Sequence, residues 1–573
     1  MRTLSVASVL AGCLLSACSG NTSAPPAAAN APAAAPAQVP LAQLPNVDQG
    51  KILEHIKALS ADSMEGRAPG TAGEEKAVGY IEGQFKQLGL APGNPDGTYI
   101  QKVPLVGITG SQTTPLTFAK AGKTLQLKWK DDVVAWSKHV APEASVAGSD
   151  VIFAGYGVEA PEYNWNDFKN TDVKGKTIVV LVNDPQVPDP ANPAALDPKL
   201  FNGKAMTYYG RWTYKFEEGA RKGAAAVLIV HDTLTAGYGF NVVQGNLSEK
   251  FDLVAPDKNM SKATIEGWIT TDAAKKLFAL AGQDFDALKK QALSRDFTPV
   301  PLGVTASMGL ANKLRTIDSR NVVARLEGAD PALKDEYVIY SAHWDHLGIG
   351  EPVGGDKIYN GALDNASGVA TVLEIARALK QVQPQPKRSF LFLMVTAEEK
   401  GLLGSEYYSV NPLYPLAKTA ANINIDEINP WGRTKDISVV GLGASELDDY
   451  LRTAAQEQGR TLTADSEPEK GFYYRSDHFN FAKQGVPALD PDGLGGTYID
   501  KPADVIKAKK TEWDEKTYHA PSDEVKPDWD LSGAVEDAHA FLAVGVRIAN
   551  ASELPKWAPG NEFKAKREAM LTK

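Results

Sequence analysis

The 573-residue sequence predicts an α/β protein whose main domain is an open, mostly parallel sheet flanked by helices. Strand-like and helical segments alternate from about residue 300 to 550, which is the pattern of such sheets. Residues 336–341 (EYVIYS) and 390–395 (FLFLMV) are almost continuously apolar, as expected for parallel strands buried on both faces. Acidic residues and histidines follow these runs, and active sites of open α/β sheets gather at the carboxyl ends of strands.

Two helices can be placed from apolar periodicity. Thr71 and Glu74 have the spacing of a capping box, apolar residues then recur on one face over residues 78–88, and Gly89 supplies a stop. A second helix is expected from Gly368, because apolar residues recur on one side of it over the next three turns.

Residues 131–297 differ in character from the rest, with short strands and long polar loops. A buried-type strand at 177–182, a helix around 214–222 and a second strand at 225–230 follow in order. The stretches GKTIVVLVNDP and KFEEGARKGAAAVLIVHD resemble the protease-associated domain, a smaller α/β domain inserted into large zinc exopeptidases. Any strand–helix–strand module would give the same pattern.

The N-terminal residues 1–18 read as an export signal. Arg2 precedes an apolar stretch that is too short to span a bilayer as a mature helix. The run ending at Cys18 resembles the lipobox of bacterial lipoproteins, with Cys13 as the alternative and an ordinary signal peptide as the other reading. Residues 19–45 are rich in Ala and Pro and predict a linker. We therefore expect an exported, periplasmic or outer-membrane-anchored protein that touches the membrane only through a lipid.

Composition excludes several classes of partner and site. The formal net charge of −10 argues against nucleic acid and anionic membranes, which need basic patches. Both cysteines lie in the export signal, so a metal in the mature protein must be held by histidine and carboxylate. The oligomeric state stays open.

Residue types that bind metals follow the predicted strands directly. In SAHWDH, His343 and Asp345 point to the same side of an extended segment, so the carboxylate could orient the imidazole. Adjacent carboxylates at a buried strand end are costly unless a positive charge compensates them, which metal ions would do. The remaining candidates stand in four further segments: Asp364 in NGALDNASG, Glu398 and Glu399 in TAEEKGLLGS, Asp426 in NINIDE, and Tyr518 with His519 in YHAPSD.

These motifs closely resemble the co-catalytic di-zinc exopeptidases (metallopeptidase family twenty-eight), which include bacterial aminopeptidases, glutamate carboxypeptidase and the transferrin receptor. SAHWDHLG, GALDNASGVA and TAEEKGLLGS are its most specific parts, and the resemblance runs from about residue 50 to 550. It implies a mixed eight-stranded sheet with helices on both faces. The peptidase domain would then be 46–130 and 298–573, interrupted by the insert.

The resemblance also assigns roles to the residues. His343 and Asp426 would bind one zinc, Glu399 and His519 the other, and Asp364 would bridge the two Zn²⁺ ions. Glu398 would be the general base, Tyr518 would steady the tetrahedral intermediate, and the Asp364–Asn365 peptide bond would be cis. Three alternatives to these ligands are open: His346 for His343, Glu427 for Asp426, and His478 for His519.

The function implied is an exopeptidase acting on peptides, with an aminopeptidase preferred over a carboxypeptidase or dipeptidase. Glu427 could bind a free amine and Arg475 a free carboxylate, so these residues alone leave the choice open. A metal-free binding protein of the transferrin-receptor type would show gaps among the ligand positions, and all are filled here. A glutaminyl cyclase would use one zinc and lack the large insert.

Overall fold

The computed structural model describes residues 39–245 and 248–572. The predicted export signal, Cys13, Cys18 and most of the predicted linker lie outside the described residues. Within the described ranges, no helix combines the length and the apolar character needed to cross a bilayer.

The last residues of the predicted linker belong to the folded part of the chain. Leu41, in the 3₁₀-helix η1 (Leu41–Gln43), and Leu44 are both buried. The Arg547 guanidinium donates to the Val39 carbonyl at 3.2 Å. The folded part therefore includes Val39, several residues before the predicted boundary at residue 45, because both leucines are buried in the core.

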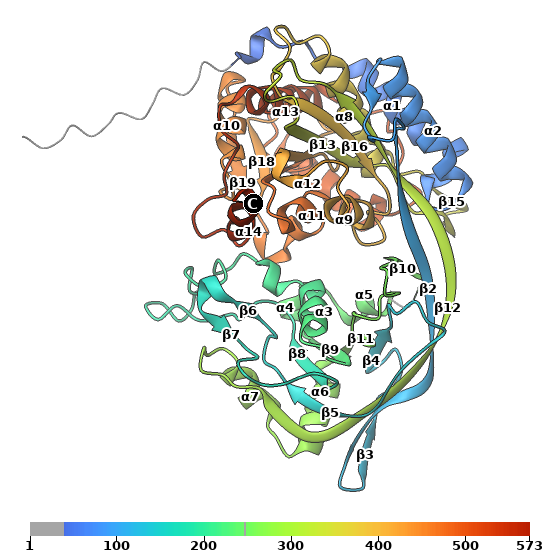
Figure 1. Cartoon of the computed structure of the whole chain (residues 1–573), viewed down its shortest axis with the longest axis vertical. Coiled ribbons are helices and arrows are strands. Elements are labelled where there is room, and N and C mark those ends of the chain that lie inside the picture. The colour runs from blue at the N-terminus through green and yellow to red at the C-terminus, as the bar shows by residue number, and fades with distance from the viewer. Residues whose placement is uncertain (1–38, 246–247, 573) are drawn as a thin grey trace, which may run out of the picture. The chain divides into compact units, whose positions relative to one another are not determined.

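A mixed sheet forms the centre of the fold (Figure 1). Its strands in this region are β2 (Ile100–Lys120), β12 (Val300–Leu326), β13 (Tyr337–His343), β16 (Ser389–Val395), β17 (Thr419–Asn424), β18 (Asp436–Val440), β19 (Thr461–Ala464) and β20 (Ala488–Asp492). The order is β19-β18-β20-β17-β13-β16-β12, with β2 on β12. Strand β13 is parallel to β16 and β17, whereas β12 and β18 run antiparallel to neighbours. The predicted mixed, mostly parallel α/β sheet is confirmed.

Helices cover both faces of this sheet, because alternate residues of its central strands face two separate cores. Val338 and Tyr340 belong to one core, and Tyr337 and Ile339 to the other. The first core is covered by α1 (Gln49–Leu59), α2 (Ala72–Gln87), α8 (Ser367–Leu379), α10 (Leu447–Glu457) and α13 (Ser532–Asn550). The second is covered by α9 (Leu403–Val410) and α11 (His478–Lys483). The two helices predicted from periodicity are α2 and α8.

The predicted capping box at the start of α2 does not form. Thr71 is the N-cap residue, but its hydroxyl donates to the Ala68 carbonyl at 2.7 Å and caps no helix N–H. Glu74 is fully buried and accepts hydrogen bonds from Ser319 and Arg320 on β12. The other oxygen of this carboxylate accepts the backbone N–H of Gly70, one residue before the N-cap, so Glu74 joins the start of α2 to β12 and does not complete a capping box with Thr71.

Residues 131–297 contain the predicted strand–helix–strand unit. Its elements are β4 (Val133–Trp136), β5 (Glu143–Phe153), β8 (Thr177–Leu181), α3 (Trp212–Arg221), β9 (Ala226–His231), β11 (Ile265–Thr270), α6 (Thr271–Ala281) and α7 (Phe285–Gln291). Strands β8 and β9 are parallel, with α3 between them in sequence. Shorter elements of the chain include β14 (Gly348–Val353), β15 (Asp356–Tyr359), α12 (Ala503–Glu512) and α14 (Lys564–Leu571).

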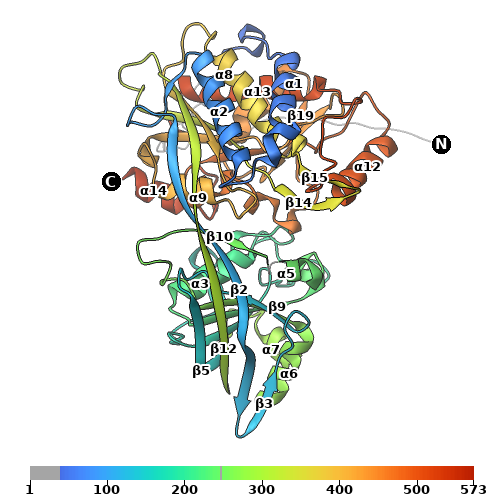
Figure 2. The same cartoon turned by 90° about the vertical axis from the view of Figure 1, so that its right-hand side faces the viewer.

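Two long strands make the whole arrangement one continuous sheet of sixteen strands. Strands β2 and β12 pair along most of their length, from Val322↔Ile100 to Thr305↔Ala119, and lie side by side in Figures 1 and 2. Strand β12 pairs with β5 near its start and with β16 near its end. The sheet therefore has more strands than the eight expected from the resemblance, because β12 pairs with β5 as well as with β16.

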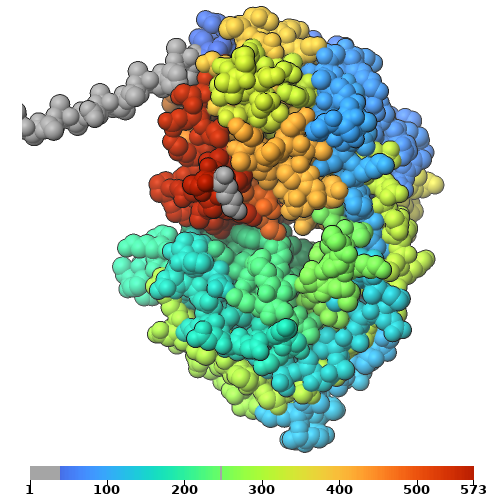
Figure 3. Space-filling view, in the orientation of Figure 1, coloured from blue at the N-terminus to red at the C-terminus, as the bar shows by residue number. Residues whose placement is uncertain are grey.

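The C-terminal helix α14 packs against the segment that leads into β17, and in Figure 3 the red surface near the C-terminus adjoins orange surface. Arg567 of α14 donates to the carbonyls of Leu416 at 3.0 Å and Thr419 at 2.8 Å. These bonds tie the last helix to the start of β17.

Close packing between α13 and β13 gives a stability prediction. A Cβ atom at Gly545 would lie 2.0 Å from the Tyr340 hydroxyl and 2.8 Å from its Cζ. We expect Gly545→Ala to lower the free energy of unfolding, measured by urea denaturation, by about 1–3 kcal/mol, as overpacking does. Adding Tyr340→Phe should recover part of this loss, because the nearest clashing atom is removed.

Gly79 in α2 is the matched control, because an added Cβ meets no atom within 4 Å there. Gly79→Ala should raise the free energy of unfolding by roughly 0.5–1 kcal/mol, the usual helix preference for alanine. Equal effects of the two alanine substitutions would contradict the packing argument.

Candidate metal centre

The predicted site residues converge at the carboxyl ends of three neighbouring parallel strands. His343 is the last residue of β13, Glu399 follows β16, and Asp426 follows β17. Asp364 lies in the turn that leads into α8, and His519 follows the helical turn η10 (Trp513–Thr517). Parallel pairing brings the strand ends to one edge, and the two remaining side chains reach the same place from loops.

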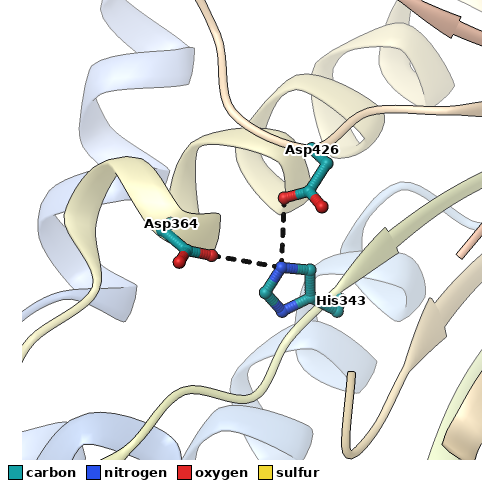
Figure 4. Close-up of side chains that lie close together, drawn as sticks. All are labelled: His343, Asp364 and Asp426. Carbon is teal, nitrogen blue, oxygen red and sulfur yellow. Dashed lines mark hydrogen bonds and ion pairs between the residues drawn. The ribbon is translucent and has the colours of Figure 1, made fainter. Parts of the chain in front are cut away.

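The first group of ligand atoms surrounds His343. Its Nε2 lies 3.1 Å from Asp426 Oδ1 and 3.2 Å from Asp364 Oδ1 (Figure 4). One N–H cannot point at two acceptors at once, but a cation between the three atoms would contact all of them. Burial by itself lowers the pKa of His343, but Asp426 and Glu398 outweigh it and hold the pKa well above the usual range.

The second group surrounds His519. Its Nε2 lies 2.9 Å from Glu399 Oε2 and 3.2 Å from Asp364 Oδ2. Asp364 thus turns one carboxylate oxygen towards each histidine. Burial raises the pKa of Asp364, but the two histidines lower it more strongly. The pKa therefore lies well below the usual range.

Both groups fit a zinc ion in donor type and in spacing. Tetrahedral ligands at about 2.0–2.1 Å from zinc lie roughly 3.3 Å from one another, close to the separations in both groups. Imidazole and carboxylate donors without thiolate are those of hydrolytic zinc sites. In addition, Glu399 Oε1 is buried with no hydrogen-bond partner among the described residues, as expected of an atom arranged for a cation.

The turn that carries Asp364 is held by hydrogen bonds on both sides. The backbone N–H groups of Leu363 and Asp364 donate to the two carboxylate oxygens of Asp523 at 2.9 and 3.1 Å. The Asn365 side chain donates to Ile425 and accepts from the Glu427 N–H. The Asp364–Asn365 peptide bond is cis, which confirms that prediction.

Glu398 lies beside the first group without joining it. Its Oε2 is 4.0 Å from His343 Nε2. Burial raises the pKa of Glu398 well above its ordinary range, although the nearby His343 lowers it. A buried carboxylate of raised pKa next to a metal position is suited to accept a proton near neutral pH.

Asp345 contacts His343 mainly through its backbone carbonyl, whereas the sequence predicted a contact through the carboxylate. His343 Nδ1 contacts the backbone carbonyl of Asp345 at 3.1 Å, while the carboxylate oxygen Oδ1 is 3.8 Å away. That oxygen instead accepts the Glu398 N–H at 3.1 Å. The carbonyl is therefore the nearer partner of the imidazole, and the carboxylate positions the loop of Glu398.

Tyr518 stands at the open side of the site. Its ring stacks on the His519 imidazole with centroids 3.9 Å apart, and 39% of its surface is exposed. Burial of the hydroxyl and the carboxylates of Asp364 and Glu399 raise its pKa well above the usual range, so the phenol stays protonated and can donate.

Sequence reasoning missed Arg67, which ends the 3₁₀-helix η2 (Asp62–Arg67) before α2. The guanidinium is fully buried and donates to the carbonyls of Leu59, Trp344, Asn360 and Gly361 at 2.6–2.9 Å. Burial lowers its pKa to about 10, and carboxylates of the site oppose that shift. Arg67 therefore fixes the segments after β13 and before Asp364. The only signal in the sequence was an arginine inside a Gly/Pro-containing loop.

The three alternative ligands occupy distinct places. His346 contacts Glu399 Oε1 with Nδ1 at 2.6 Å, on the side away from His343. Glu427 follows Asp426, and burial raises its pKa well above the usual range. His478 is buried against Tyr473, with ring centroids 4.7 Å apart, and Asp490. Ser476, which had no assigned role, donates to Asp426 Oδ2 at 2.6 Å.

Comparison with known proteins places this site in a family. Aminopeptidase NAALADL1 of Mus musculus is 36% identical over 132 residues, which are 22% of this chain and 16% of that protein. Aminopeptidase YwaD of Bacillus subtilis (strain 168) is 30% identical over 200 residues, 34% of this chain and 37% of that protein. This chain thus spans less than half the length of either relative. A solved aminopeptidase from Aneurinibacillus sp. strain AM-1 aligns over 89% of this chain and 96% of its own, with 19% identity and a TM-score of 0.47.

Residues 321–543 match Peptidase family M28. This range holds both histidine groups, Glu398 and Tyr518. The part of the chain that builds the candidate metal centre is therefore a Peptidase family M28 domain.

Proposed function

We propose that this chain is a zinc-dependent exopeptidase, and more narrowly an aminopeptidase that releases N-terminal residues from peptides. The observation that carries the proposal is the geometry around Asp364, whose two oxygens face one imidazole–carboxylate group each. The family match over the same residues supports the reaction class, and both curated relatives are named aminopeptidases.

Two Zn²⁺ ions per chain would fill the two groups. His343 and Asp426 would hold one ion, Glu399 and His519 the other, and Asp364 would bridge them. When bound, the ions would supply Lewis acidity, which polarises the peptide carbonyl and lowers the pKa of the attacking water.

The protein side chains supply the proton transfer. Glu398 would take a proton from the water at its carboxylate and deliver it to the leaving amine, for which its raised pKa is suited. The Tyr518 hydroxyl would donate a hydrogen bond to the oxygen that becomes negative in the tetrahedral intermediate. Asp345 would keep Glu398 in place through the loop N–H.

Glu427 favours an amine as the group recognised at the substrate end. No lysine, arginine or histidine nitrogen of the described ranges forms an ion pair with its carboxylate. Burial and the negative charges of Asp364 and Asp426 raise its pKa, so a cation arriving from the substrate would be stabilised there. The free α-amino group of a peptide is such a cation.

Arg475 favours the second candidate, a carboxypeptidase. It precedes Ser476, which contacts Asp426, and its guanidinium lies 5.0 Å from the Phe472 ring centroid. The side chain is exposed and has no carboxylate partner within the described part of the chain. It could meet the carboxylate of a peptide C-terminus.

The proposal extends to location and organisation. Export and lipid anchoring at Cys18 rest on the character of residues 1–18. Residues 131–297 would be a protease-associated domain inserted between residues 46–130 and 298–573 of the peptidase domain. The strand–helix–strand unit of β8, α3 and β9 supports that assignment.

Removing the metal gives the first functional prediction. Prolonged dialysis against a chelator should abolish peptidase activity, because the Lewis acidity of the metal ions is lost. Added Zn²⁺ should restore the activity. Elemental analysis of the active protein should give about two zinc ions per chain. An active preparation with one tightly bound metal or none would contradict the two-ion proposal.

The neighbouring glutamates should respond differently to amide substitution. Glu398→Gln should keep both metals and lower kcat by about 10²–10⁴-fold, the usual cost of losing a general base. Glu399→Gln should in addition weaken metal binding, because Oε2 is a proposed ligand. Metal content and kcat measured on both variants decide the matter, and equal metal loss would show that the two roles are misassigned.

The preferred terminus can be tested with matched substrates and variants. An aminopeptidase cleaves leucine p-nitroanilide but not its N-acetylated form, and it tolerates an amidated C-terminus. Glu427→Gln should raise KM for the free-amine substrate by about tenfold or more, since it removes a charge-assisted contact of roughly 1.5–3 kcal/mol. Arg475→Gln should leave that KM unchanged. Cleavage of N-acetylated peptides that depends on Arg475 would establish the carboxypeptidase instead.

A further inference from the structure

His346 is a buried histidine that none of the roles above employs. It is fully buried, and neither ring nitrogen has a hydrogen-bond partner within the described ranges. Leaving both polar atoms of a buried imidazole unpaired is costly, so such a side chain calls for an explanation.

The ring faces the second ligand group. Its Nδ1 lies 2.6 Å from Glu399 Oε1 and 4.0 Å from Asp364 Oδ2. Nδ1 and Oε1 thus form an ion-pair contact, but neither atom has a hydrogen-bond partner within the described ranges. Ligand atoms of His346, Asp364 and Glu399 lie within 4.8 Å of one another, which a single ion can bridge.

The surroundings fix the ring in this direction. A Cβ atom at Gly361 would lie 2.6 Å from the Cγ of His346, so only glycine leaves room for the imidazole. The backbone N–H of His346 donates to the Arg67 carbonyl at 3.4 Å. The His519 ring packs edge to face against the His346 ring, with centroids 5.7 Å apart. A side chain held this firmly by backbone and neighbours is suited to ligation.

We propose that His346 is a third imidazole ligand, which binds through Nδ1 the same metal ion as Glu399, His519 and Asp364. The inference rests on the proposed function, because it presupposes two ions at this centre. His346 adds to His343 as a ligand and does not replace it, since the two rings serve opposite sides of Asp364.

The extra ligand makes the two metal positions unequal. The position of Glu399 then has four protein ligands, as in closed sites, whereas the position of His343 has three and retains an open place near Glu398. The ion held by four protein ligands should be released more slowly on dialysis against a chelator than the ion held by three.

The test counts imidazole ligands in the loaded protein. In the full-length protein with Co²⁺ in both positions, the exchangeable ring N–H protons of bound histidines are shifted far outside the diamagnetic range of the proton NMR spectrum. We expect three such signals, from His343, His346 and His519. In zinc-loaded protein with ¹⁵N-labelled histidine, one bound histidine should carry its proton on Nε2 and two on Nδ1.

A variant series supplies the second measurement. His346→Gln should lose one shifted signal and bind one of the two metals about 10–100-fold more weakly, the range seen when metal-site partners are removed. The matched control is His139→Gln, which replaces a buried histidine of the insert whose Nε2 contacts the Lys262 carbonyl. It should keep three signals and both affinities.

The outcomes separate the two proposals. Two metals with only two shifted imidazole signals in the unmodified protein would overturn the role of His346 and leave the peptidase proposal standing. Failure of the unmodified protein to bind zinc or cobalt would overturn the peptidase proposal itself. The count in the unmodified protein decides the inference even where His346→Gln does not fold.

Discussion

The structure depends on one electrostatic constraint, the burial of several carboxylates at one edge of the sheet. Asp345 follows β13, Glu398 and Glu399 follow the adjacent strand β16, and Asp364 joins them from the turn before α8. Like charges in a low-dielectric environment repel strongly, and desolvation adds a further penalty. The opposite shifts of the pKa of Asp364 and Glu398 show how unevenly that penalty is distributed. Two divalent ions would remove most of it, which links the folding of this edge to metal binding.

The rest of the fold can be understood as support for that edge. Alternate residues of β13 and β16 enter two cores, so the strands that end in the ligands are fixed on both faces. The Arg67 guanidinium donates to the carbonyls of Trp344 and Gly361, which belong to the two loops that flank the site. Among the described residues, no other guanidinium does so. Asp523 holds the Asp364 turn through two backbone N–H groups. These protein contacts hold the ligand atoms in place, which is what a pre-organised site requires.

Much of this architecture was predictable because it depends on patterns within short segments of the sequence. Apolar runs placed β13, β16 and β8, periodicity placed α2 and α8, and motif order placed His343, Asp364 and Glu399 behind strands. Interactions between residues distant in sequence were not predictable. Arg67 contacts carbonyls 277 to 294 positions away, and Glu74 accepts a hydrogen bond from Ser319 on β12. The Asp345 carboxylate was expected to orient His343, but the backbone carbonyl of Asp345 is the nearer group. The shared length of β12 was hidden as well, since pairing with β5 at one end and β16 at the other has no local signature.

The shared strands β2 and β12 limit how this protein can change over evolutionary time. Side chains alternate between the two faces of a strand, so a single inserted residue sends every following side chain to the opposite face. A length change in these strands preserves both cores only when β2 and β12 grow or shrink together by two residues, a step of roughly 7 Å. Single-residue changes need a place where the alternation already breaks, and the pairing of β12 with β2 is irregular around Gly309. Insertions and deletions among relatives that keep this sheet should therefore cluster near Gly309 or occur as matched pairs in the two strands.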